Sequence, residues 1–335
     1  MTILTKHVER DIMILIPSHQ VSMHLKGGIG LADSKYLAID LGGTEIKYAL
    51  ITEAADILEK SKVATPREMK TTMSDLIDVL GDIISKYQAE IKGIALSSPG
   101  IIDSDTGHSY SSGAIHYIAG NNLPKLLHEK FNLPVTVEND GKAAALAELW
   151  KGSLTGVQNA AVVLLGTGVG GGLIINGQLY KGRNFAAGEM SFMLSNPALG
   201  EYWGGTGGSS HLLKLVSKKK KIPFEALDGY KVFEMINAGD ADALAALDGY
   251  TEGLVYQLYN MQSLLDLDVF AIGGGISQQP LLLEYMQKHI DEECGNHPFK
   301  EYMPFIPTPK LTTCKFFNDS NLIGALYHHL NKVNE

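Results

Sequence analysis

The chain of 335 residues is long enough for two domains and has 45% hydrophobic and 19% charged residues, the composition of a soluble globular protein. Its formal net charge of −9 excludes the strongly basic surface with which proteins bind nucleic acid or anionic membranes, and no apolar run has the length of a membrane span. Its two cysteines, Cys294 and Cys314, cannot build a disulfide framework or, by themselves, a zinc site. We therefore expect a cytoplasmic protein with reduced thiols and with neither a nucleic-acid nor a membrane partner.

Residues 1–35 are a poor start for a folded domain. Their apolar run, residues 12–16, ends at Pro17 and directly follows the charged residues 9–11. A signal peptide instead begins with a basic stretch that leads into a longer apolar core. We expect residues 1–35 to form a loosely ordered extension ahead of the first domain.

The first folded element is a hairpin around a glycine turn. Two apolar runs, residues 37–41 and 46–51, flank Gly42-Gly43-Thr44. Asp40 stands inside the first run, where a carboxylate is costly unless it meets a cation or hydrogen-bond donors. The glycine N–H groups could approach an anion closely, and the threonine adds a hydroxyl donor. The pattern indicates a phosphate-holding turn with Asp40 placed for a hydrated Mg²⁺, or else an ordinary hairpin with a buried, satisfied Asp40.

Downstream, strands and helices alternate. Short apolar runs predict strands at 57–65, 91–96, 134–138, 160–165, 173–176, 269–272 and 311–316. Apolar residues three and four apart, or runs rich in alanine and leucine, predict helices at 71–87, 122–131, 140–150, 209–217, 230–238, 241–265, from 279 onward and at 318–331. We expect the four lysines at 218–221 to form a solvated loop. The alternation predicts an α/β protein with a largely parallel or mixed sheet covered on both faces.

The second half of the chain repeats the opening hairpin. Strand 160–165 runs into five glycines within residues 166–172, and Leu165-Gly166-Thr167-Gly168 matches Leu41-Gly42-Gly43-Thr44. This repeat predicts a duplicated fold whose two turns hold one polyphosphate across a cleft, although glycines can also simply ease a tight hairpin. Strand 269–272 then passes through Gly273-Gly274-Gly275 into a helix, which would leave bare backbone for a flat ring such as adenine.

Together these motifs resemble those of the ROK family of sugar kinases, which have the actin-like (hexokinase-like) ATPase fold. The matching motifs, in family order, are Asp40-Leu41-Gly42-Gly43-Thr44 with Lys47, Ser98-Pro99-Gly100 with Asp103, Glu138-Asn139-Asp140, residues 165–172, Gly188-Glu189, and Gly273-Gly274-Gly275. The resemblance covers Tyr36 to the C-terminus. It implies a duplicated α/β fold with domains at 36–152 and 153–317, a closing helix at 318–335 packed on the first domain, and a homodimer.

The resemblance also assigns roles to single residues. It makes Asp140 the catalytic base, and a carboxylate there could accept the proton of a sugar hydroxyl that attacks the γ-phosphorus of ATP. The alternative for Asp140 is helix N-capping, a role that Asn139 could share. The implied phosphate contacts are Gly42, Gly43, Thr44, Lys47, Gly166, Thr167, Gly168 and Gly170, with Mg²⁺ held through water by Asp40 and adenosine at Gly273, Gly274 and Gly275. The implied sugar contacts are Gly100, Asn122, Asn139, Glu189 and His211.

The sequence departs from the family pattern after Gly188-Glu189. Phe192 stands where most members have a histidine, and the cysteine positions of the family's zinc run hold Tyr202, Gly204 and Ser209. We therefore expect no zinc site. Because His211 also replaces a sugar-binding glutamate, N-acetylmannosamine or a β-glucoside is as plausible a substrate as glucose.

Two other functions are compatible with the family. A ROK-type transcriptional regulator would need a DNA-binding domain within the 35 residues that precede the first strand, which are interrupted by Pro17 and are not notably basic. A non-catalytic sugar sensor would keep the fold without turnover. The intact Asp40, Asp140 and both glycine turns favour an ATP-dependent kinase.

Overall fold

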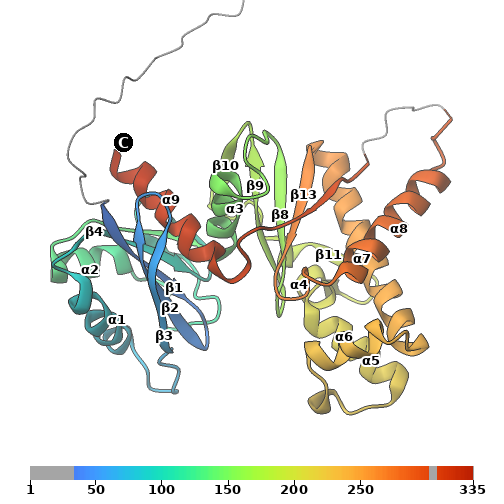
Figure 1. The fold of residues 1–335 in the computed structure, drawn as a ribbon, viewed down its shortest axis with the longest axis horizontal. Coiled ribbons are helices and arrows are strands. Elements are labelled where there is room, and N and C mark those ends of the chain that lie inside the picture. The colour runs from blue at the N-terminus through green and yellow to red at the C-terminus, as the bar shows by residue number, and fades with distance from the viewer. Residues whose placement is uncertain (1–33, 302–307, 335) are drawn as a thin grey trace, which may run out of the picture. The chain divides into compact units, whose positions relative to one another are not determined.

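The computed structural model of this chain describes residues 34–301 and 308–334. All but the last two residues of the extension expected at 1–35 lie outside these described residues. Two five-stranded sheets with the same pattern of strand connections dominate the fold (Figure 1). No helix among the described residues is both long and apolar enough to cross a membrane.

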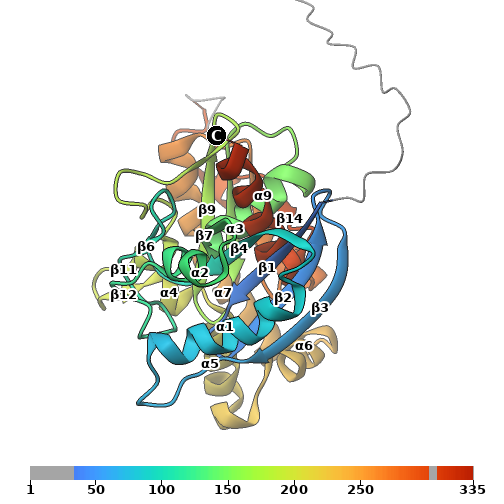
Figure 2. The same ribbon diagram turned by 90° about the vertical axis from the view of Figure 1, so that its left-hand side faces the viewer.

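The first sheet has the strand order β3-β2-β1-β4-β7. Its strands are β1 (Lys35–Leu41), β2 (Glu45–Thr52), β3 (Ile57–Ala64), β4 (Ile91–Ser98) and β7 (Val135–Asn139). The first three form an antiparallel meander, and β4 and β7 run parallel to β1. Helices α1 (Met73–Tyr87) and α2 (Leu123–Phe131) pack in one hydrophobic core with this sheet (Figure 2).

The second sheet repeats this arrangement with the order β10-β9-β8-β13-β14. Its strands are β8 (Ala160–Leu165), β9 (Val169–Ile175), β10 (Gln178–Tyr180), β13 (Val269–Gly273) and β14 (Leu311–Thr313). Again the first three strands form an antiparallel meander, with the glycine turn between its first two strands, and two parallel strands follow. The duplication predicted from the repeated glycine motif is therefore confirmed.

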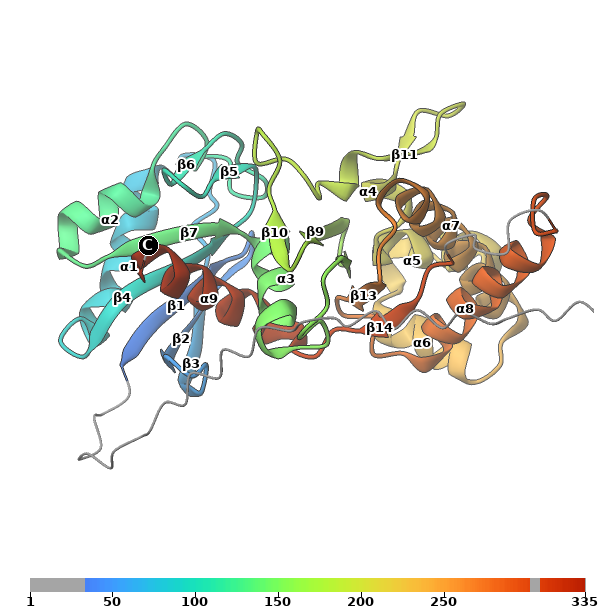
Figure 3. The same ribbon diagram turned by 90° about the horizontal axis from the view of Figure 1, so that it is seen from above.

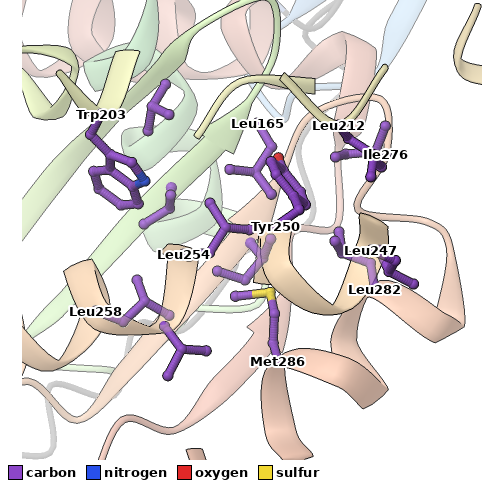
Figure 4. Packing of buried hydrophobic residues seen from close by; sticks show 14 of the residues in the cluster. Leu165, Trp203, Leu212, Leu247, Tyr250, Leu254, Leu258, Ile276, Leu282 and Met286 are labelled. Atoms are coloured by element: carbon purple, nitrogen blue, oxygen red, sulfur yellow. The ribbon is translucent and has the colours of Figure 1, made fainter. Parts of the chain in front are cut away.

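A further layer of helices covers one face of the second sheet. It consists of α5 (Ser209–Lys220), α6 (Gly229–Asn237), α7 (Ala241–Leu265) and α8 (Pro280–Asn296), with the one-turn α4 (Trp203–Thr206) beside them. Figure 4 shows Tyr250, Leu254 and Leu258 of α7 in the same cluster as Leu165 of β8 and Trp203. This cluster is the largest buried core of the described chain.

Two helices meet where the sheets approach each other. Helix α9 (Ser320–Asn334) packs on β1, β4 and β7 of the first sheet, whereas α3 (Asp140–Lys151) packs on β9 of the second sheet and on α9 (Figures 1 and 3). The two helices cross at Gly324, where a Cβ atom would overlap the Ala143 carbonyl oxygen. Strand alternation puts Asp40 on the same face as Ala38, which packs against α9.

The structure corrects three local expectations. Lysines 218–220 belong to the last turn of α5, where the helix dipole favours cations, and Lys221 is its left-handed C-cap. Strand β9 begins at Val169, so Gly170, Gly171 and Gly172 are strand residues rather than turn residues. The strand expected at 311–316 ends at Thr313.

Several short elements carry too little periodicity for prediction. They are β5 (Ile102–Asp103), β6 (His108–Ser109), β11 (Leu194–Asn196), β12 (Glu201–Tyr202) and the 3₁₀ turns η1 (Met190–Phe192), η2 (Phe224–Ala226) and η3 (Phe317–Asp319).

Candidate active site

A cavity of about 610 Å³ lies between the ends of the two sheets. Its walls are the loop after β4, the start of α3, the turn between β8 and β9, the segment around η1, and Asn321 of α9. The structure brings the following predicted site residues together here: Gly100, Asn139, Asp140, Gly166, Thr167, Gly168, Gly170 and Glu189.

Asp140 is the first residue of α3 and directly follows β7. Its Oδ1 accepts hydrogen bonds from the Gly141 N–H at 2.8 Å and from Asn139 Nδ2 at 3.0 Å. The N-cap of α3 is Asn139, whose side chain accepts the Lys142 N–H at 3.1 Å. Because Asn139 takes the capping role, the Asp140 carboxylate is not needed for it.

The environment of Asp140 disfavours its charged form. Burial raises the pKa of this carboxyl to about 6, and the negative charges of Asp40 and Glu189 add to the rise, while the Gly141 N–H and the Lys142 charge oppose it. A carboxylate with a pKa near neutral pH is suited to accept a proton during a reaction.

Asp40 lies in β1 and its side chain is held by two donors. Its Oδ1 accepts hydrogen bonds from Ser97 Oγ at 2.9 Å and from Asn321 Nδ2 at 3.0 Å. Ser97 is its register partner on β4, and Asn321 comes from α9 and lines the cavity.

Asp40 is a single carboxylate beside the cavity, which limits the kind of metal site that could form here. The described residues contain no group of three or more His, Cys, Asp or Glu side chains that could cage an ion. A single carboxylate beside a phosphate site suits Mg²⁺, which keeps several waters and binds through one or two carboxylates plus phosphate oxygens.

The first glycine turn contacts the cavity wall rather than lining it. The Gly42 N–H bonds to the Glu45 carbonyl at 3.1 Å, and a Cβ atom on Gly43 would lie 2.7 Å from Cβ of Ala114, a wall residue. Lys47 borders a different cavity, of about 500 Å³, with Lys60 and other residues of β2 and β3. Lys47 is the register partner of Asp40 on the neighbouring strand, but it does not line the cavity of Asp140.

The second glycine turn is tied to α5 and to the third glycine cluster. The Gly166 N–H bonds to the Gly168 carbonyl at 3.0 Å, and the Gly166 carbonyl accepts the Ser209 N–H at 2.8 Å. Gly274 has φ +93°, and a Cβ atom there would overlap the Leu165 carbonyl. Gly273 and Gly274 thus adjoin the strand that enters the second turn. None of Gly273, Gly274 and Gly275 lines the 610 Å³ cavity.

Three of the predicted sugar contacts, Gly100, Asn139 and Glu189, lie together beside Asp140. The Gly100 carbonyl accepts a hydrogen bond from Asn139 Nδ2 at 2.9 Å. Position 100 requires glycine, because its φ is +99° and the Ser111 carbonyl leaves no space for a side chain. Glu189 Oε1 accepts a hydrogen bond from Lys142 Nζ at 2.9 Å. These groups surround Asp140 on its side of the cavity.

The other two predicted sugar contacts lie elsewhere. Asn122 caps α2 by accepting the Lys125 N–H at 3.0 Å, and its amide donates to the Thr106 carbonyl at 2.7 Å. His211 borders a separate cavity of about 140 Å³ beside Tyr250, because the first turn of α5 directs this position toward α7. Neither residue lines the cavity of Asp140.

Sequence reasoning missed several residues at the site. Ser97 and Asn321 hold Asp40, Lys142 pairs with Glu189, and Ser111 and Ala114 form a wall. Two of these residues could have been noticed in the sequence: Ser97 is a serine within a buried strand, and Lys142 is a lysine directly before a run of alanines. The position of Asn321 depends on the crossing of α3 and α9, which no local pattern encodes.

Phe192 lines the mouth of the cavity with 66% of its surface exposed. In the segment that corresponds to the family's zinc run, Trp203 is buried, and the Tyr250 hydroxyl donates to the Gly207 carbonyl at 2.7 Å. Trp203 and Tyr250 both belong to the hydrophobic core of the second sheet.

Two sheets of the same strand order, each opened by a hairpin around a glycine turn, with a cavity between them, define the actin-like ATPase fold. The protein-family model described as "ROK family" matches residues 36–331 of the sequence. The chain belongs to this family.

Relatives and a solved structure agree with this assignment. The chain is 31% identical to a glucokinase of Halalkalibacterium halodurans over 78% of this chain and 86% of the relative. It is 28% identical to a beta-glucoside kinase of Listeria monocytogenes over 90% and 99%, respectively. The structure of a ROK family protein of Streptococcus pneumoniae in complex with sucrose matches with a TM-score of 0.79 and 30% identity, covering 90% of this chain and 99% of that one.

Proposed function

We propose that this protein is an ATP-dependent sugar kinase that transfers the γ-phosphoryl group of ATP to a hydroxyl of a hexose-type sugar. The observation that carries the proposal is a partly buried carboxylate, Asp140, facing the same cavity as the second glycine turn. Relatives named glucokinase and beta-glucoside kinase support the reaction class.

In the proposed reaction, Asp140 is the catalytic base. Its carboxylate accepts the proton of the sugar hydroxyl as that oxygen forms a bond to the γ-phosphorus, and the bond to the leaving oxygen breaks so that ADP departs with the electron pair. Asn139 and Glu189 hold neighbouring sugar hydroxyls, and the Gly100 carbonyl fixes the Asn139 amide.

ATP is proposed to span both glycine turns. The phosphate contacts are Gly42, Gly43, Thr44, Lys47, Gly166, Thr167, Gly168 and Gly170, with adenosine against Gly273, Gly274 and Gly275. Asp40 would hold Mg²⁺ through water, and that ion would neutralise phosphate charge. Phosphoryl transfer depends mainly on such positioning and charge neutralisation.

The proposed substrates are glucose, a β-glucoside or N-acetylmannosamine. Phe192 at the cavity mouth favours the two sugars that carry an apolar substituent. We further propose that residues 36–152 and 153–317 act as two domains, with residues 318–335 as the closing helix, and that the protein works in the cytoplasm as a homodimer.

A coupled assay for ADP release across these sugars tests the reaction class. Sugar-dependent ADP release is the expected result. Sugar binding without any turnover would overturn the kinase assignment in favour of a non-catalytic sensor, and sugar-dependent binding to DNA would favour a regulator.

A further inference from the structure

A lysine is buried beside the proposed base. Lys142 is the third residue of α3, and its side chain is 1% exposed. Its neighbours along the helix are the small apolar residues 143–145. A buried ammonium group is costly unless it is paired and hydrogen-bonded, so its partner must contribute to holding this part of the site together.

The partner of Lys142 is Glu189, a cavity residue from a different part of the chain. Nζ of Lys142 lies 2.9 Å from Glu189 Oε1. The Glu189 side chain is 23% exposed, so one end of the ion pair is buried while the other borders the cavity.

Glycines bring these two residues within reach of each other. A Cβ atom on Gly141 would lie 2.6 Å from the Gly171 nitrogen, and one on Gly172 would lie 3.3 Å from the Lys142 Cα. A Cβ atom on Gly188 would lie 3.2 Å from the Gly172 Cα. Helix α3 therefore contacts β9 backbone to backbone, and the residue after Gly188 meets the lysine.

The charges around the cavity give the ion pair a second consequence. Asp40 from β1, Glu189 from the segment before η1 and Asp140 from α3 place three carboxylates near one another, and Lys142 is a cation among them. A neutral residue at position 142 would leave Glu189 without this partner and would expose Asp140 to uncompensated negative charge.

From this geometry we propose that Lys142 is a positioning residue of the sugar site: it fixes the Glu189 carboxylate so that this carboxylate can accept hydrogen bonds from sugar hydroxyls. The inference rests on the proposed function, because it takes the sugar site to be the cavity of Asp140. Lys142 acts through Glu189 and does not itself touch substrate.

The test compares Lys142→Met, which keeps the length and removes the charge, with Lys142→Arg and with the exposed Lys151→Met on the same helix. We expect Lys142→Met to raise the sugar KM about tenfold or more and to change the ATP KM less than twofold. In the pH profile of kcat/KM, the acidic limb, where activity falls as Asp140 becomes protonated, should move to higher pH. Lys142→Arg should restore part of the sugar affinity, and Lys151→Met should match wild type.

Thermal unfolding of the double variant Lys142→Met/Glu189→Gln covers the case in which the single variant does not fold. Removing both charges leaves neither member of the pair uncompensated, so the double variant should fold and still bind sugar weakly. A normal sugar KM together with an unmoved acidic limb in a folded Lys142→Met variant would overturn the positioning role. If that variant does not fold, a normal sugar KM of the folded double variant would overturn it.

Sugar binding measured by calorimetry without ATP separates this inference from the kinase proposal. If wild type binds sugar but never releases ADP, the kinase proposal fails while the role of Lys142 is still decided by binding. Unchanged sugar binding in both variants would then overturn the inference.

Discussion

Asp140 combines a proposed catalytic role with an energetic cost. Its folded-state pKa is raised from 3.8 to about 6. A raised carboxyl pKa means that the folded state binds the proton more tightly than the unfolded state. This contribution to stability is present below about pH 4 and is lost as pH rises toward 6. At pH 7 the ionised carboxylate therefore destabilises the fold, by about 3 kcal/mol at most given about 1.4 kcal/mol per pKa unit.

Replacing this carboxylate should separate activity from stability. We expect Asp140→Asn to lower kcat by about 10²-fold or more because the base is lost. The same change should raise the melting temperature at pH 7, since an amide oxygen can still accept the Gly141 N–H without a charge. Steady-state kinetics and calorimetry measure the two effects. A variant that kept most of its kcat would contradict the assignment.

The pH dependence of activity follows from the same group. The base must be ionised, so kcat/KM should fall below a pH of about 6, the pKa of Asp140. Glu189→Gln should move this acidic limb to lower pH, because the Glu189 charge raises that pKa. The exposed Glu129→Gln on α2 is the control and should leave the limb in place. A limb near pH 4 in wild type would argue against Asp140.

Phe192 should influence which sugar is preferred. We expect wild type to have a higher kcat/KM for an N-acetylhexosamine or a β-glucoside than for glucose, because an apolar substituent buried on the ring contributes about 25 cal/mol per Å². Phe192→His should shift the ratio toward glucose, with about 0.5–1.5 kcal/mol available per hydrogen bond gained. Leu199→Ala, at another exposed apolar position, should not. A wide preference of wild type for glucose would refute this role.

At the scale of elements, the crossing of α3 and α9 holds the site in place. Asn321 reaches Asp40 from α9, and Asp140 begins α3. Gly324 allows these helices to touch, because a Cβ atom there would overlap the Ala143 carbonyl.

Gly324→Ala should therefore destabilise the protein by about 1–3 kcal/mol, or by more if the backbone cannot shift. Gly249→Ala in α7 is the matched control: it is also a helical glycine, but open space surrounds its Cβ position. That variant should be more stable by about 0.5–1 kcal/mol on helix propensity alone. Denaturant unfolding distinguishes the two, and equal effects would mean that the helix crossing is not tight.

At the scale of the whole molecule, we expect the fold to be stable without zinc, because a hydrophobic core occupies the segment where family members have their zinc-binding cysteines. Trp203 is 1% exposed within the largest core, in the segment where family members have their cysteines. Metal analysis of the purified protein should find no stoichiometric zinc, whereas ADP release should require Mg²⁺. Chelation should abolish turnover and leave the melting temperature unchanged.

Trp203→Ala, in contrast, should cost about 3–5 kcal/mol of stability. Zinc at one equivalent per chain would show that the protein has a metal site which the described residues do not reveal.

The sequence by itself determined the longer elements and their order. Both glycine hairpins, the helix at 241–265 and the strand before Asp140 follow from local periodicity and turn residues, which act over a few neighbours. The repeat of the glycine motif also implied the duplicated sheets, because each copy specifies the same local unit.

Only the tertiary structure decided which side chains share the cavity. Asn122 and His211 match the family's sugar positions in sequence, yet one is used as a helix cap and the other faces α7. Lys142 and Asn321 reach the site only because glycines let α3 approach β9 and α9. Such contacts depend on register and helix crossing, which are set by packing between segments far apart in the chain.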